Sequence, residues 1–224
     1  MFAKKGRRFP INTTAVVFEQ PERLAPAKLD LSPPGEEDVV VDIHWTGIST
    51  GTERLLWTGR MPPFPGMGYP LVPGYESVGR VLEAGVRSGR HVGDTVFVPG
   101  AKCFGAVRGL FGGAAARLVV PGARSVPIAE HLGEQAVRLA LAATAYHAIA
   151  PGELRHPDLI VGHGVLGRLL ARLVLATGGA APTVWEVNPA RAGGAEGYAV
   201  IDPASDPRRD YRCICDVSGD AALL

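Results

Sequence analysis

Three glycines with the spacing G-x-G-x-x-G are the residues that most directly imply a chemistry. Gly162, Gly164 and Gly167 follow the apolar run 158–161 and precede a segment of good helix formers at 168–176. In such a turn the first glycine permits a tight bend, the second lets the backbone approach a pyrophosphate, and the third lets helix and strand pack closely. The pattern predicts a dinucleotide site that also includes Val165 and Leu166. The alternative is a glycine-rich turn in another kind of α/β unit.

An acidic residue stands where a dinucleotide site requires one. Glu186 ends a second apolar run, 182–185, about 24 residues beyond Gly162, and this is where the pattern places an acceptor for the adenosine ribose 2′-hydroxyl. A carboxylate repels the 2′-phosphate of NADP, so the sequence predicts NAD as the cofactor. Arg191 is a further predicted cofactor ligand, and its positive charge works against that preference.

Composition limits the number of domains and the classes of function that the chain can have. The 224 residues are 46% hydrophobic and 20% charged, enough for one large or two small domains. A net charge of +1 gives no electrostatic footprint for nucleic acid, and no run of ~18 apolar residues predicts a membrane span. The basic residues 1–12 lack the apolar region of a secretory signal. Three cysteines, an odd and low number, favour a cytoplasmic protein.

The two halves of the chain differ in pattern. Residues 13–128 contain short β-branched runs separated by glycine and proline, which predicts a β-barrel-like domain. Residues 129–224 begin with a helical pattern at 132–150 and continue with the strand–turn–helix–strand unit, which predicts an α/β dinucleotide-binding domain. A full domain of this kind has two such halves, so the sequence predicts an incomplete one that stops after about its fourth strand.

This domain order resembles the medium-chain dehydrogenase/reductase superfamily. Residues 70–81 read PLVPGYESVGRV and resemble the family segment P-x-x-x-G-H-E-x-x-G-x-V; residues 93–96 read GDTV and resemble its G-D-x-V. Residues 140–148 resemble the helix T-A-Y-x-A that lies against the nicotinamide. The resemblance implies a GroES-like substrate domain, a Rossmann domain for a nicotinamide cofactor, and a cofactor contact at Thr144.

The same resemblance predicts that the chain holds no metal. Members that oxidise simple alcohols often bind a catalytic zinc through three side chains and leave one position open. Ser49, Tyr75 and Ala140 stand at the three ligand positions here. Cys103 is the single cysteine in the region of the four-cysteine structural zinc lobe.

Without a metal, a side chain must accept the proton of an alcohol substrate. The candidates are Thr50, Glu53, Tyr75 and Glu76, with the Tyr75 phenol as a relay and Glu53 as a final base. Two structural alternatives remain open: Glu76 is a buried acid paired with a base such as Arg60, and Tyr75 only packs. His163, inside the glycine turn, contacts either phosphate or solvent.

Residues 57–69 form a stiff segment rich in proline and glycine that also carries large side chains. We expect these side chains either to pack on one another or to form a wall for a large, flat, apolar substrate. They are Trp57, Met61, Phe64, Met67 and Tyr69.

The segments 15–21 and 48–70 resemble, more narrowly, the BchC family of bacteriochlorophyll-biosynthesis dehydrogenases. That resemblance implies NAD-dependent oxidation of the 3-(1-hydroxyethyl) group of a chlorophyllide or bacteriochlorophyllide macrocycle to 3-acetyl, with a homodimer left open. Two alternatives remain. One is a zinc-free, NADPH-dependent quinone or enone reductase, and the other is a non-catalytic fragment or pigment-binding module.

Overall fold

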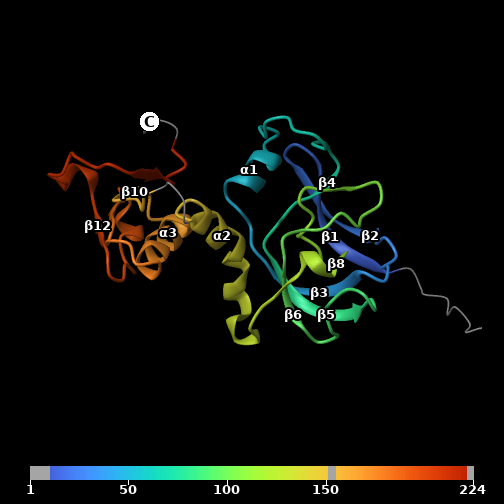
Figure 1. The fold of residues 1–224 in the computed structure, drawn as a ribbon. Helices are drawn as coiled ribbons and strands as arrows, with labels where there is room; N and C mark the ends of the chain where they lie inside the picture. The colour runs from blue at the N-terminus through green and yellow to red at the C-terminus, as the bar shows by residue number, and fades with distance from the viewer. Residues whose placement is uncertain (1–10, 151–154, 221–224) are drawn as a thin grey trace, which may run out of the picture. The chain divides into compact units, whose positions relative to one another are not determined.

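The computed structural model describes residues 11–150 and 155–220. The chain divides into two units, which we treat separately: unit 1 is Met1–Arg138 and unit 2 is Leu139–Leu224 (Figure 1). The division lies later along the chain than the predicted boundary at 128/129. The difference arises because η2 (Glu130–Arg138) packs against β3, β5 and β6 of unit 1.

Unit 1 is built from two β-sheets. One has the strand order β8-β3-β5-β6-β9 and is antiparallel throughout, and the other has the order β2-β1-β4-β7, with β4 and β7 parallel. The strands are β1 (Asn12–Gln20), β2 (Arg23–Asp30), β3 (Asp38–Thr46), β4 (Leu71–Val72), β5 (Ser77–Ala84), β6 (Thr95–Val98), β7 (Arg108–Gly109), β8 (Arg117–Pro121) and β9 (Val126–Pro127).

The core of unit 1 explains why these segments are strands. Along β1 buried and exposed residues alternate over most of its length, as expected for a strand with one face toward a core. Fully buried β-branched side chains from β3 and β6, such as Val39, Val41 and Val96, form the main hydrophobic cluster with Leu118 of β8. β2 was not predicted because it contains Pro26, which a sheet tolerates at an edge, where β2 lies.

Unit 2 contains a parallel sheet with the order β12-β11-β10-β13, the order of the first half of a doubly wound sheet. Buried side chains of α3, among them Leu170 and Val174, cover Ile160 and Val184 of the sheet. The elements are α2 (Leu139–His147), β10 (Leu159–Val161), α3 (Val165–Ala176), β11 (Thr183–Trp185), η3 (Pro189–Arg191), β12 (Ala199–Ile201), η4 (Pro203–Ser205) and β13 (Ile214–Asp216).

The helix predicted over 132–150 is not continuous. Gly133 has φ 49° and ψ −131°, which no helical residue adopts, and the α-helical part begins only at Leu139. Unit 1 contributes the remaining helical elements, α1 (Thr52–Trp57) and η1 (Gly122–Arg124). Across the described residues, no helix combines the length and apolar character that a membrane crossing needs.

Candidate functional site

The glycine turn of unit 2 has the geometry that a bound dinucleotide requires. Gly162 has φ +100°, a bend that favours glycine. A Cβ added to Gly164 would meet nothing within 4 Å, whereas a Cβ on Gly167 would overlap the Gly162 carbonyl oxygen. The turn is therefore open at its second glycine and tightly packed at its third, with the first residues of α3, Val165 and Leu166, directly after it.

A pocket of about 300 Å³ opens beside this turn, at the carboxyl ends of β10, β11 and β13. Ligands of doubly wound sheets bind at this end of the strands. The sequence did not single out the contributions of β13 and η4, because these segments are distant along the chain and carry no motif. The lining residues are Val161, Gly162, Gly164, Trp185, Glu186, Val187, Arg191, Pro203, Val217, Ser218 and Asp220.

Glu186 places a carboxylate in that pocket. Its Oε2 accepts a hydrogen bond from the His163 backbone amide (3.0 Å), and its Oε1 accepts one from the Asn188 backbone amide (2.8 Å). Burial by itself would raise the pKa of Glu186, but these two amides and the charge of Arg191 outweigh it, so the pKa lies below its ordinary value. The pocket therefore carries an ionised acceptor at neutral pH.

The side chain of His163 is not exposed to solvent, and both of its ring nitrogens have partners within the protein. Its side chain is fully buried, with Nδ1 2.6 Å from the Arg191 carbonyl oxygen and Nε2 2.8 Å from the Tyr198 hydroxyl. Since a carbonyl only accepts, Nδ1 donates to the Arg191 carbonyl oxygen, and Nε2 shares a second hydrogen bond with the Tyr198 hydroxyl. Arg168 donates to the carbonyl oxygens of both His163 and Arg191. His163 thus ties the glycine turn to η3 and to the start of β12.

Thr144 lies exposed on α2, where its hydroxyl donates to the Ala140 carbonyl (3.0 Å). It does not line the pocket beside the glycine turn. Its contact with the cofactor therefore stays a prediction.

Two buried carboxyl groups dominate the candidate site of unit 1. Glu53 on α1 is 6% exposed, and Glu76, directly before β5, is 4% exposed. Glu53 Oε2 accepts from the Ser49 backbone amide (3.0 Å), whereas Oε1 of both glutamates is buried without a hydrogen-bond partner in the described part of the chain. Neither carboxyl forms an ion pair with Arg60 or any other described base, so the pairing considered for Glu76 is not found.

The environment of these groups changes their acidity. Burial raises the pKa of Glu53 to about 7; the backbone amides of Glu53 and Ser49 lower it in part, and the charge of Glu76 raises it further. Burial also raises the pKa of Glu76. A carboxyl group with a pKa near 7 is suited to exchange a proton with a substrate at neutral pH.

The other two predicted catalytic residues lie near Glu53. Thr50 lines a pocket together with it. The Tyr75 hydroxyl is 3.4 Å from the hydroxyl of Thr52, the residue before Glu53, and the Tyr75 ring meets Phe111 edge-on. Thr52 was not predicted, since a lone threonine at the start of a short helix carries no sequence signal.

The pocket beside Glu53 has a volume of about 420 Å³ and is mainly apolar. Phe18 and Trp57 form one wall, with ring centroids 5.7 Å apart. This places a carboxyl group with a pKa of about 7 next to an apolar surface that includes two aromatic rings. The lining residues are Phe18, Leu24, Ile48, Ser49, Thr50, Glu53, Arg54 and Trp57.

Of the five large side chains predicted to form a substrate wall, Trp57 alone lines this pocket. Met61, Phe64, Met67 and Tyr69 are partly buried against Phe18, Leu56, Leu71 and Leu110, and Tyr69 also donates to the Leu56 carbonyl. For these four residues the structure favours the self-packed alternative. They pack in one cluster with Trp57, because a segment this rich in proline and glycine cannot bury its large side chains in a regular element.

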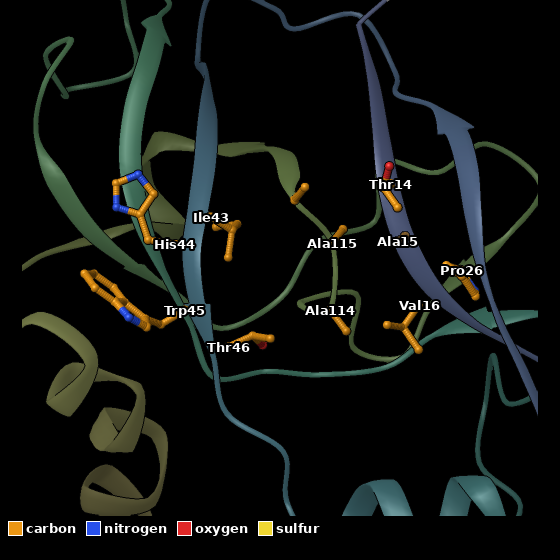
Figure 2. Close-up of a pocket in the computed structure, with 11 residues that line it drawn as sticks. Thr14, Ala15, Val16, Pro26, Ile43, His44, Trp45, Thr46, Ala114 and Ala115 are labelled. Atoms are coloured by element: carbon orange, nitrogen blue, oxygen red, sulfur yellow. The ribbon is translucent and has the colours of Figure 1, made fainter.

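A second apolar pocket of unit 1, about 260 Å³ in volume, contains none of the predicted site residues. Figure 2 shows Ile43, His44, Trp45 and Thr46 along β3 and Thr14, Ala15 and Val16 along β1, with Ala114 and Ala115 between them. It carries no acid or nucleophile comparable to Glu53. Within the ranges that the structure describes, no three His, Cys, Asp or Glu residues gather as a metal site.

Comparison with known proteins matches this architecture to dehydrogenases. Residues 35–130 match the alcohol dehydrogenase GroES-like domain. The structure resembles 2R,3R-butanediol dehydrogenase from Bacillus subtilis with a TM-score of 0.76 at 20% identity, over 95% of this chain and 72% of that one. The chain thus has a GroES-like domain followed by a Rossmann-type unit, as predicted.

Two curated relatives are much closer in sequence. The 2-desacetyl-2-hydroxyethyl bacteriochlorophyllide A dehydrogenases of Rhodobacter capsulatus and Cereibacter sphaeroides are each 56% identical to this chain, over 215 and 219 residues. The matches cover 96% of this chain and 68% and 69% of the relatives. The chain therefore belongs to the family of 2-desacetyl-2-hydroxyethyl bacteriochlorophyllide A dehydrogenases, within the medium-chain dehydrogenase/reductase superfamily.

Proposed function

We propose that this protein oxidises the 3-(1-hydroxyethyl) group of a chlorophyllide or bacteriochlorophyllide to 3-acetyl with NAD. The observation that carries the chemistry is Glu53, a buried carboxyl with a pKa of about 7 beside an apolar pocket. The substrate class is taken from the relatives, whose names specify a hydroxyethyl bacteriochlorophyllide. The macrocycle is the partner we propose, in the cytoplasm and without nucleic acid; a homodimer remains open.

The residues of unit 2 fit a nicotinamide dinucleotide. The space at Gly164 would admit a pyrophosphate to the start of α3, where unpaired helix amides favour an anion. The ionised Glu186 would accept the ribose 2′-hydroxyl and would repel a 2′-phosphate, which favours NAD over NADP. Arg191 also lines the pocket, and its positive charge works against the preference for NAD.

In unit 1, Glu53 lines the apolar pocket and accepts the proton of the substrate hydroxyl. Thr50 and Tyr75 orient that hydroxyl through their own hydroxyl groups, and Phe18 and Trp57 hold the flat ring and exclude water. Burial raises the pKa of Glu76 as well, and the charge of Glu76 raises that of Glu53, so each carboxyl opposes ionisation of the other. When bound, the nicotinamide supplies the acceptor for the hydride that leaves the carbon bearing the substrate hydroxyl.

The test is an assay of the purified protein with a 3-(1-hydroxyethyl) chlorophyllide or bacteriochlorophyllide, called the hydroxyethyl pigment below, and either NAD or NADP. We expect an acetyl product and NADH, with NADP a poorer cofactor. Reduction of an enone with NADPH, without oxidation of the pigment, would replace this proposal by the reductase alternative. Pigment binding without turnover under any of these conditions would instead indicate a pigment-binding module.

A further inference from the structure

The apolar pocket beside Glu53 is lined by one cation. Arg54 follows Glu53 on α1 and is exposed. Within the described residues its side chain makes no hydrogen bond, and it belongs to none of the ion pairs. By contrast Arg23, on the neighbouring β2, is bound to Glu19 at 2.6 Å.

The buried carboxyls do not use the charge of Arg54. The pKa of Glu53 is set by burial, by two backbone amides and by Glu76, and the pKa of Glu76 is set by burial. The charge of Arg54 is not among these causes, although Arg54 is adjacent to Glu53 in the chain. Its guanidinium is therefore available to an anionic group of a ligand in the pocket.

A guanidinium at the edge of an aromatic pocket matches a ligand with a flat apolar body and a carboxylate on its rim. A chlorophyllide is such a ligand, because its propionate is a free carboxylate, whereas in a chlorophyll the same group is esterified. We propose that Arg54 binds the free propionate of the pigment and makes the enzyme selective for the unesterified macrocycle. This inference rests on the proposed function for its substrate class.

The experiment compares the free acid of the hydroxyethyl pigment with its methyl ester, in wild type, Arg54→Gln and Arg54→Lys. Both KM and kcat are measured, and binding is followed separately by pigment absorbance without cofactor. We expect wild type to bind the acid at least roughly tenfold more tightly than the ester. Arg54→Gln should abolish that preference by weakening binding of the acid alone, with kcat within about twofold. Arg54→Lys should retain part of it, since an ammonium binds a carboxylate without the bidentate geometry.

Arg60→Gln is the matched control, because Arg60 is also exposed and nearby but does not line the pocket. It should leave the preference for the acid unchanged. Equal affinity of wild type for acid and ester would overturn the inference, and so would an equal loss for both ligands in Arg54→Gln, which would indicate packing by the arginine stem. If wild type binds the acid selectively but oxidises neither ligand, the proposed reaction fails while the role of Arg54 stands.

Discussion

At the scale of single residues, ionisation of Glu53 connects catalysis and stability. An oxidation in which Glu53 accepts the proton requires its carboxylate form, so activity should rise with pH through about 7. Glu53→Gln removes the acceptor and should lower kcat by about 10²-fold or more, with loss of that pH dependence. Glu83→Gln, at an exposed position of β5, is the control. A Glu53→Gln enzyme with a wild-type pH profile would exclude Glu53 as the base.

Glu53→Gln, which should lower activity, should raise the stability of the folded protein above pH 7. The pKa of Glu53 is about 7 in the folded protein against 4.5 for a free carboxyl, so the folded state binds the proton more tightly. The stabilising contribution of Glu53 is therefore complete below pH 4.5 and is lost as the pH rises through about 7. Thermal unfolding of Glu53→Gln should occur at a higher temperature than that of wild type above pH 7, and the gap should shrink toward pH 4.5.

Glu186 is the residue that we expect to select the cofactor. Glu186→Ala should cost roughly 1–3 kcal/mol of NAD affinity and narrow the gap between NAD and NADP. Glu186→Gln separates charge from shape, because its amide oxygen can still accept from one of the amides of His163 and Asn188. Titration of both cofactors against the three proteins gives the answer. An unchanged NAD/NADP ratio in both variants would show that Glu186 does not contact the ribose.

At the scale of elements, two glycines of the turn between β10 and α3 should affect different properties. Substitution of Gly164 should affect cofactor binding, and substitution of Gly167 should affect the stability of the fold. Gly164 has φ −73° and ψ −170°, which any residue adopts, and free space at its Cβ. Gly164→Val should leave the free energy of unfolding within about 0.5 kcal/mol of wild type and abolish NAD binding by filling the pyrophosphate space.

Gly167→Ala is the counterpart inside the same element. Its Cβ would overlap the Gly162 carbonyl oxygen, so α3 would have to move away from β10, at a cost of about 1–3 kcal/mol in unfolding free energy. Chemical denaturation of both variants tests the pair. Equal destabilisation at the two positions would contradict the difference expected between the two glycines.

At the scale of the whole molecule, hydride transfer has to proceed without a metal if the sequence prediction holds. Ser49 and Tyr75, which the family resemblance places at two zinc-ligand positions, form hydrogen bonds with Thr52. Elemental analysis of the purified protein should find well under one zinc per chain, and chelators should leave the activity intact. Stoichiometric zinc would overturn the reading of these positions.

Elements whose residue types recur at a regular spacing could be predicted from the sequence. The β-branched runs 14–18, 38–43, 77–82 and 94–98 were predicted as strands, and they lie within or largely overlap β1, β3, β5 and β6. The glycine turn was predicted because its spacing is itself a geometric requirement. The short strands β4, β7 and β9 were not, since two-residue pairings depend on neighbours distant in the chain.

The sequence by itself determined the order of the two units, the dinucleotide turn with its acid, and the set of candidate catalytic side chains, because each depends on residues close together in the chain. Tertiary structure alone decided which of these side chains are buried and what surrounds them. Burial of Glu53 and Glu76 raises both pKa values, and the buried His163 ring contacts the Arg191 carbonyl oxygen and the Tyr198 hydroxyl. Desolvation and charge coupling depend on what surrounds a group in space, and no spacing along a chain contains that information.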